Sequence, residues 1–140
     1  MSQNAEQPTN GRPGGRPPAG DVYDWYQRGM RLLSGGDPAA AAHVLEHAVA
    51  AEPESRSLRE ALARAQYDAR QYPAARENFA QLADSDPTDD YAQFGWGLAA
   101  RKLGDLQEAV HHLALAAAMR PELGHYGREL RGARAERARR

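Results

Sequence analysis

The feature of this sequence that constrains its fold most is a regular period in the positions of its small and apolar residues. Prolines recur at positions 53, 87 and 121, which are evenly spaced. The same spacing separates the residues of three further sets, and within each set the residues are similar in size. We call these sets columns: Gly29, Ala63 and Gly97; Ala41, Ala75 and Ala109; and Leu45, Phe79 and Leu113. A fixed period with matching residue sizes at matching positions predicts a stack of repeated units rather than a single irregular core.

Each repeated unit is predicted to contain two helices, and the third unit shows this most clearly. Within residues 90–121, two alanine-rich segments with apolar residues at helical spacing flank a break at Gly104. Such a break between two helical segments is typical of an antiparallel pair joined by a tight turn. Gly97 and Ala109 fall where the two backbones must approach closely. Pro121 closes the unit, because proline is tolerated in the first turn of a helix but not inside one.

The pattern resembles the tetratricopeptide repeat (TPR), which follows W-x2-L-G-x2-Y, then A-x3-F, then P, over about 34 residues. The matching residues in the three units are Trp25, Gly29, Leu32, Ala41, Leu45 and Pro53; Leu62, Ala63, Ala75, Phe79 and Pro87; and Gly97, Ala109, Leu113 and Pro121. Arg28 and Gln66 depart from the pattern, and Arg70 replaces the turn glycine that Gly36 and Gly104 supply. The resemblance implies an all-α solenoid of three TPR units at about residues 22–54, 55–88 and 89–121.

Different segments are expected on the two sides of the repeats. Residues 1–20 are rich in proline and glycine and contain almost no large apolar residue, which predicts a disordered tail. In residues 122–140, Leu123, Tyr126 and Leu130 share one helical face. This predicts a seventh helix that covers the third unit and presents a polar outer face, with a frayed end.

Capping residues and breaks give the expected helix limits. Asp21, Asp37, Ser55 and Thr88 are expected N-caps, and Asp105 with Glu108 forms a capping-box-like start. The expected helices span about residues 22–34, 38–51, 56–70, 73–83, 89–102 and 105–119, before the seventh.

No arrangement of residues typical of catalysis or metal binding is found. The chain has no cysteine, which excludes disulfides, thiolate metal sites and cysteine nucleophiles. His43 and His47 share a helical face, but a third ligand is missing, so a zinc site is not favoured. His111 and His112 are interpreted as surface residues of an outer helix. We therefore expect a non-enzymatic protein with no cofactor and no metal.

The overall charge and hydropathy give no sign of a membrane or nucleic-acid protein. The net charge is −1, no apolar run is long enough to span a bilayer, and no secretory signal is present. We expect a cytoplasmic protein, and the Ala, Arg and Gly content suggests a bacterial one. One basic cluster, with arginines at 128, 131, 134 and 137, could contact phosphates. Because Glu129 and Glu136 dilute it, a solvated helix is favoured over a nucleic-acid site.

The resemblance also implies a binding surface, since in TPR proteins the first helix of each unit lines a concave groove. The residues at the groove positions are Tyr23, Tyr26, Met30, Leu33, Arg64, Tyr67, Tyr91, Phe94, Leu98, Arg101 and Lys102. Tyrosine and arginine are common anchors of interfaces. The groove is therefore expected to bind a protein or peptide, with Tyr26, Tyr91 and Phe94 as anchors. Self-association of the chain and plain packing of these side chains are the alternatives.

One TPR subclass holds the C-terminal carboxylate of chaperones with lysine, asparagine and arginine side chains. The positions that match this clamp are Tyr26, Met30, Ala61, Tyr91 and Gly95, and none carries a suitable residue. Binding of a chaperone tail by such a clamp is therefore not expected.

Overall fold

Seven helices follow one another in the structure, a computed structural model that describes residues 15–140. They are α1 (Val22–Ser34), α2 (Pro38–Ala51), α3 (Arg56–Asp68), α4 (Tyr72–Ser85), α5 (Asp90–Lys102), α6 (Leu106–Met119) and α7 (Gly124–Ala138). Residues 15–140 contain no strand, and none of their helices is both long and apolar enough to cross a membrane. Most of the tail expected at residues 1–20 lies outside the described residues. Of the part that is described, the carbonyl of Pro18 accepts a hydrogen bond from Trp25 Nε1 at 3.0 Å.

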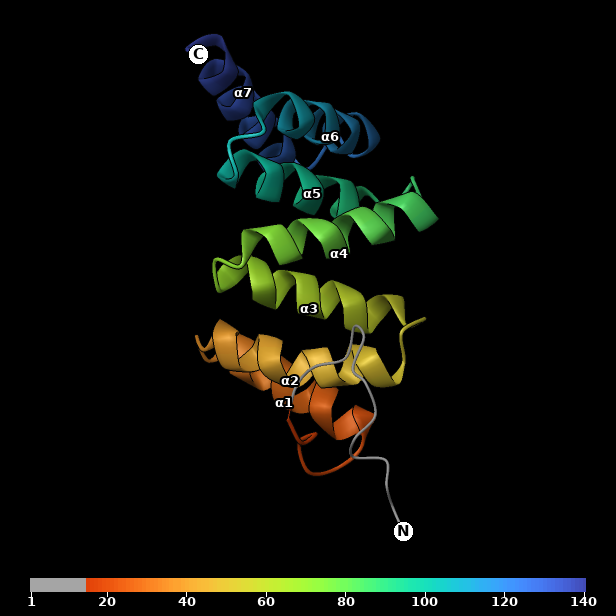
Figure 1. Cartoon of the computed structure of the whole chain (residues 1–140). Helices are drawn as coiled ribbons and strands as arrows, with labels where there is room; N and C mark the ends of the chain where they lie inside the picture. Colours follow the sequence, from red (N-terminus) through yellow and green to blue (C-terminus); the bar gives the residue numbers. More distant parts are fainter. Residues whose placement is uncertain (1–14) are drawn as a thin grey trace.

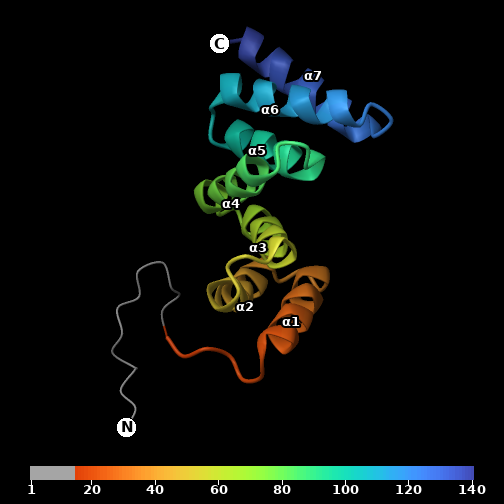
Figure 2. The same ribbon diagram turned by 90° about the vertical axis from the view of Figure 1, so that its right-hand side faces the viewer.

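The helices stack in chain order from one end of the molecule to the other (Figure 1). Each helix packs on the next, and α1 also contacts α3, α3 contacts α5, and α5 contacts α7. The even-numbered helices make no such contacts with one another within the described chain. The odd-numbered helices therefore line the inner side of the stack, while α2, α4 and α6 lie outside (Figure 2). This arrangement confirms the predicted all-α solenoid.

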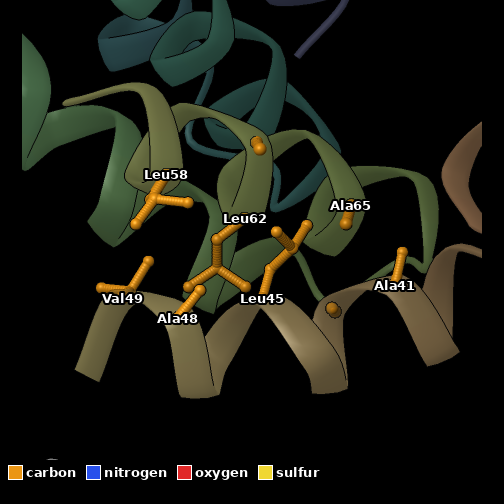
Figure 3. Packing of buried hydrophobic residues seen from close by; sticks show 9 residues of the cluster. Ala41, Leu45, Ala48, Val49, Leu58, Leu62 and Ala65 are labelled. Atoms are coloured by element: carbon orange, nitrogen blue, oxygen red, sulfur yellow. The ribbon is translucent and has the colours of Figure 1, made fainter. Parts of the chain in front are cut away.

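The columns of small residues allow the helices to pack this closely. A Cβ atom at Gly29 would lie 2.7 Å from Cγ of Leu45, and one at Gly97 would lie 2.7 Å from Cγ of Leu113. Both leucines are completely buried. Figure 3 shows the environment of Leu45 between α2 and α3, where Leu62 faces it. The large and small columns found in the sequence thus interlock in space.

The turns inside the units adopt one shared conformation. Gly36 and Gly104 have φ angles of +86° and +85°, in the left-handed region. Arg70 occupies the equivalent position in the second unit and also has a positive φ, of 65°. Because a side chain disfavours this region by about 1–2 kcal/mol, the repeat geometry overrides the preference of the arginine.

Three of the expected N-caps are confirmed. The side chains of Asp21, Asp37 and Ser55 each accept a hydrogen bond from a backbone N–H in the first turn of their helix. Asp105 is the N-cap residue of α6, as expected, but its side chain makes no capping hydrogen bond. Its carboxylate instead forms an ion pair with Arg76 of α4.

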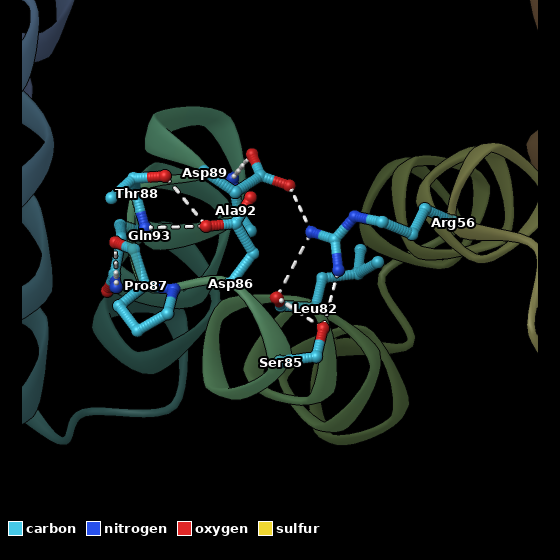
Figure 4. A network of polar contacts seen from close by, with 9 residues as sticks. All are labelled: Arg56, Leu82, Ser85, Asp86, Pro87, Thr88, Asp89, Ala92 and Gln93. Carbon is cyan, nitrogen blue, oxygen red and sulfur yellow. Dashed lines mark hydrogen bonds and ion pairs between the residues drawn. The ribbon is translucent and has the colours of Figure 1, made fainter.

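The cap of α5 also differs from the prediction. Asp89, not Thr88, is the N-cap, and Thr88 instead donates to the carboxylate of Asp86. The second oxygen of Asp89 accepts from Arg56 of α3 at 2.6 Å, and Arg56 also donates to the carbonyl of Leu82 at 3.1 Å. Figure 4 shows that this one guanidinium joins three consecutive helices. The cap is therefore part of the contact between the second and third units.

Candidate functional site

Two adjoining pockets lie on the inner side of the solenoid, along α3 and α5. The first, which we call the apolar pocket, has a volume of about 270 Å³ and is lined by Arg64, Tyr67, Asp68, Phe79, Tyr91, Phe94, Gly95 and Leu98. The second, the charged pocket, has a volume of about 470 Å³ and is lined by Tyr67, Leu98, Arg101, Lys102, Glu129 and Glu136. Tyr67 and Leu98 belong to both pockets. The two therefore adjoin at these side chains, and we call them together the groove.

The floor of the apolar pocket depends on a glycine. A Cβ atom at Gly95 would lie 2.5 Å from three ring atoms of Phe79, which projects from α4 and is only 2% exposed. In the preceding unit the equivalent positions, one period earlier, hold Leu45 and Ala61. The larger ring in the second unit thus requires the smaller residue in the third.

Two tyrosines form walls of this pocket. The ring of Tyr91 contacts that of Phe79 edge to face, with centroids 5.9 Å apart, and Tyr67 contacts Tyr72 in the same way at 5.2 Å. Burial raises the pKa of both Tyr67 and Tyr91 to about 12. Both phenols are therefore neutral at physiological pH and can donate hydrogen bonds to a ligand.

The charged pocket is closed by α7. Glu129 accepts from Nη1 of Arg101 at 3.0 Å, and Glu136 accepts from Nε of the same side chain at 2.8 Å. Gly132 lies beneath this guanidinium, since a Cβ there would be 2.8 Å from Nη2. The sequence placed Arg101 among the groove residues, and the structure pairs it there with two carboxylates.

The contribution of α7 to the groove was missed at the sequence level. Glu129 and Glu136 lie one period after Gly95 and Lys102. The same step therefore continues past Pro121, and α7 takes the place of the first helix of a fourth unit. Extending the column comparison by one unit would have found both carboxylates.

Phe94 does not have the open position expected of an anchor. It is 6% exposed, and its ring stacks on that of Tyr126 with centroids 4.3 Å apart. The hydroxyl of Tyr126 donates to Asp90 at 2.6 Å, which fixes α7 against α5. Phe94 therefore belongs mainly to the contact between these helices and contributes only part of its surface to the pocket.

The expected groove residues of the first unit lie away from both pockets. Tyr26, Met30 and Leu33 are half-buried against the core cluster around Leu45, and Tyr23 is 68% exposed. The structure brings together only the residues expected in the second and third units, which are Arg64, Tyr67, Tyr91, Phe94, Leu98, Arg101 and Lys102. The candidate site is thus centred on α3 and α5.

Two histidines, His47 and His112, are buried, although His112 was expected at the surface. His112 donates from Nδ1 to Oε1 of Gln93 at 2.7 Å, and its ring stacks on Trp96 with centroids 3.6 Å apart. Burial, with a smaller effect of His111, lowers the pKa of His112 to about 4. Burial also lowers the pKa of His47. Both imidazoles are therefore neutral core groups, and residues 15–140 contain no cluster of three potential metal ligands.

Comparison with known families and structures identifies the repeat. A family model described as tetratricopeptide repeat matches residues 26–90 and, overlapping these, residues 60–123. Together the two matches cover more than half of the chain. No curated protein matches the sequence significantly.

Several solved structures share the fold. MamA from Desulfovibrio magneticus RS-1 superposes with a TM-score of 0.80 and 21% identity, over 84% of this chain and 67% of that one. A MamA mutant superposes with a TM-score of 0.75 and 22% identity, over 86% of this chain and 66% of that one. The first TPR of Spaghetti (RPAP3), bound to the HSP90 peptide SRMEEVD, superposes with a TM-score of 0.77 and 18% identity, over 84% of this chain and 93% of that one. The chain spans about two thirds of these MamA chains, and identities this low establish the fold alone.

Proposed function

This chain belongs to the tetratricopeptide repeat family, and on that premise we propose that it binds a protein or peptide partner in the groove and catalyses no reaction. The apolar pocket carries the proposal. Aromatic rings and Leu98 surround its opening, while the charges of Arg64 and Asp68 lie among the lining residues. Pockets that combine apolar walls with a few polar groups are typical ligand sites, and side chains buried in such pockets dominate binding energy.

The shape and charge of the groove define the partner. A pocket of about 270 Å³ suits a large apolar side chain. Because Arg101 is paired with Glu129 and Glu136, Arg64 and Lys102 are the groove cations without an ion pair among the described residues. A partner segment is therefore expected to insert an apolar residue and to place a carboxylate beside it.

The site also differs from a clamp for a terminal carboxylate. The RPAP3 domain is bound to a peptide of HSP90, and one TPR subclass holds chaperone tails by their terminal carboxylate. In this chain Tyr91 and Gly95 occupy clamp positions and line the apolar pocket instead. We infer that the partner is recognised through an internal apolar residue rather than through its C-terminus.

End-to-end self-association is the weaker alternative. Leu58, Ala61, Leu62 and Ala65 are the buried residues through which α3 packs on the preceding unit. The equivalent positions of α1, one period earlier, hold Asp24, Gln27, Arg28 and Arg31. This polar surface offers no apolar area for stacking a second copy, which favours a separate partner in the groove.

A displayed library of random peptides, selected on the immobilised protein, tests the proposal. The selected peptides should share an apolar residue next to an acidic one. Leu98→Glu places a charge in both pockets and should weaken their binding by roughly thirtyfold, the loss typical of an interface anchor. Leu115→Glu is the matched control, because Leu115 is 38% exposed on α6. Equal affinity of the two variants, with unchanged helicity, would place the binding site elsewhere.

A further inference from the structure

The carboxylates of α7 all lie on its inner side. Tyr126, Leu130 and Ala133 are buried in the core cluster shared with α6. Glu129 and Glu136 are the acidic residues of this helix, and both bind Arg101 in the groove. From the sequence, these two residues were expected to dilute the basic cluster. The structure shows that their charge is used on the other side of the helix.

The charged side chains on the outer side of α7 and at the chain end beyond it are therefore all positive. We call this surface the arginine face; it consists of Arg128, Arg131, Arg134, Arg137, Arg139 and Arg140. All six are exposed, and none forms an ion pair with residues 15–140. The helix that carries these residues, α7, is the last of the stack (Figures 1 and 2) and contacts only α5 and α6 among the described helices.

Small residues separate these arginines. Gly124, Gly127, Ala135 and Ala138 fill the same side of the helix. The Nη1 atom of Arg128 lies 3.4 Å from the place of a Cβ at Gly124, and that of Arg131 lies equally close to Gly127. These two guanidinium groups therefore lie along the helix surface beside the glycines.

The arginine face lacks the small residues by which α5 lets α6 approach. The residues of α5 that allow α6 to approach include Gly97 and Ala100. Their equivalents in α7, one period later, are Arg131 and Arg134. Close helix packing is thus replaced by a row of positive charges that advances about 4.5 Å per step along the helix.

We propose that the arginine face binds the phosphate backbone of duplex DNA without sequence preference. Guanidinium groups match phosphate oxygens in a bidentate manner, and duplex DNA carries one charge per about 1.7 Å. The face offers no apolar anchor of the kind that a protein partner requires. It also carries no aromatic side chain on which unpaired bases could stack, which disfavours a single strand.

Fluorescence anisotropy with a labelled duplex of mixed sequence, about 30 base pairs long, tests the proposal with the full chain. The logarithm of the binding constant should fall linearly with the logarithm of salt between about 50 and 200 mM, with a slope of about −0.9 per phosphate contacted. The variant R128Q/R131Q/R134Q should bind more weakly and reduce this slope by about 2.7. Glutamine keeps the helix propensity, so that α7 should still form.

A matched control separates this site from general charge. The variant R16Q/R31Q/R70Q removes the same charge from exposed positions outside both α7 and the groove and should change affinity much less. Leu98→Glu should bind DNA as the wild type does. This variant therefore separates DNA binding by the arginine face from peptide binding in the groove.

Three results would overturn the proposal: equal loss in both triple variants, stronger binding of a single strand or of polyglutamate than of the duplex, or no binding at about 50 mM salt. Light scattering that shows a salt-sensitive dimer, lost in the α7 variant, would assign the face to self-association instead.

Discussion

Replacing Gly95 with alanine should destabilise the fold, although alanine is the better helix former. The added Cβ would lie 2.5 Å from three ring atoms of Phe79, whereas carbon atoms prefer about 3.5–4.0 Å. Phe79 is 2% exposed and packs edge to face on Tyr91, and this contact restrains its ring. Overpacking costs up to about 3 kcal/mol, and the helix-propensity gain offsets about 1 kcal/mol. We expect a net loss of about 2 kcal/mol.

The chain itself suggests the compensating change. Leu45 and Ala61 form the equivalent pair one unit earlier, so Phe79→Leu combined with Gly95→Ala recreates a combination that this fold already contains. The double variant should be more stable than the sum of the two single effects predicts, by about 1 kcal/mol or more. Gly127→Ala is the control, since only the Arg131 guanidinium lies near it, at 3.4 Å, and it should gain about 1 kcal/mol.

Urea and thermal unfolding followed by circular dichroism measure these differences. For a domain of this size, a loss of about 2 kcal/mol corresponds to a fall in Tm of roughly 8 °C. If Gly95→Ala gains stability as Gly127→Ala does, Phe79 is free to move and the close contact does not limit the fold. Strict additivity of the double variant would contradict the coupling between the two positions.

Two further changes test other parts of the structure. Arg70→Gly should stabilise the protein by about 1 kcal/mol, because Arg70 has a φ of 65° at a turn where Gly36 and Gly104 stand; an equal gain from Arg70→Ala in thermal unfolding would contradict this reason. For His112, the pKa of about 4 in the fold lies below the unfolded value of about 6.5. Protonation therefore favours the unfolded state, and stability should fall by up to about 1.4 kcal/mol per pH unit as the pH drops from about 6.5 towards about 4. His112→Asn should flatten this dependence in urea titrations at pH 7 and 5; an unchanged slope would show that other groups cause it.

The repeat and its packing could be predicted because they depend on residue size at a fixed spacing. Gly97 and Leu113 are identified by the columns to which they belong, and the close contact between them follows from the helix pair. The repeat pattern was followed only as far as Pro121, and the last helix was interpreted as a separate cap. The pairing of Arg101 with Glu129, and the stacking of Phe94 on Tyr126, were therefore missed, since both need a partner from α7.

The buried histidine was missed for a related reason. The sequence position of His112 alone gives no sign that its side chain has a buried hydrogen-bond partner, because that partner, Gln93, lies on the other helix of the unit. One unit earlier, Arg59 donates to Asn78 at 2.9 Å from the equivalent positions. Reading pairs of columns rather than single columns would have indicated a polar contact inside the second and third units; in the first unit the equivalent residues are Trp25 and Val44. The cytoplasmic location and bacterial origin stay predictions from composition.

The most direct test of the groove is a chemical-shift map recorded by NMR. A peptide selected on the protein is titrated into the isotope-labelled chain, and the perturbed backbone amides are placed on the structure. We predict that they cluster on the inner side of α3 and α5, around Tyr67, Tyr91 and Leu98, and that Leu98→Glu abolishes the changes. Perturbations confined to α2, α4 and α6, or to the outer side of α7, would contradict binding in the groove.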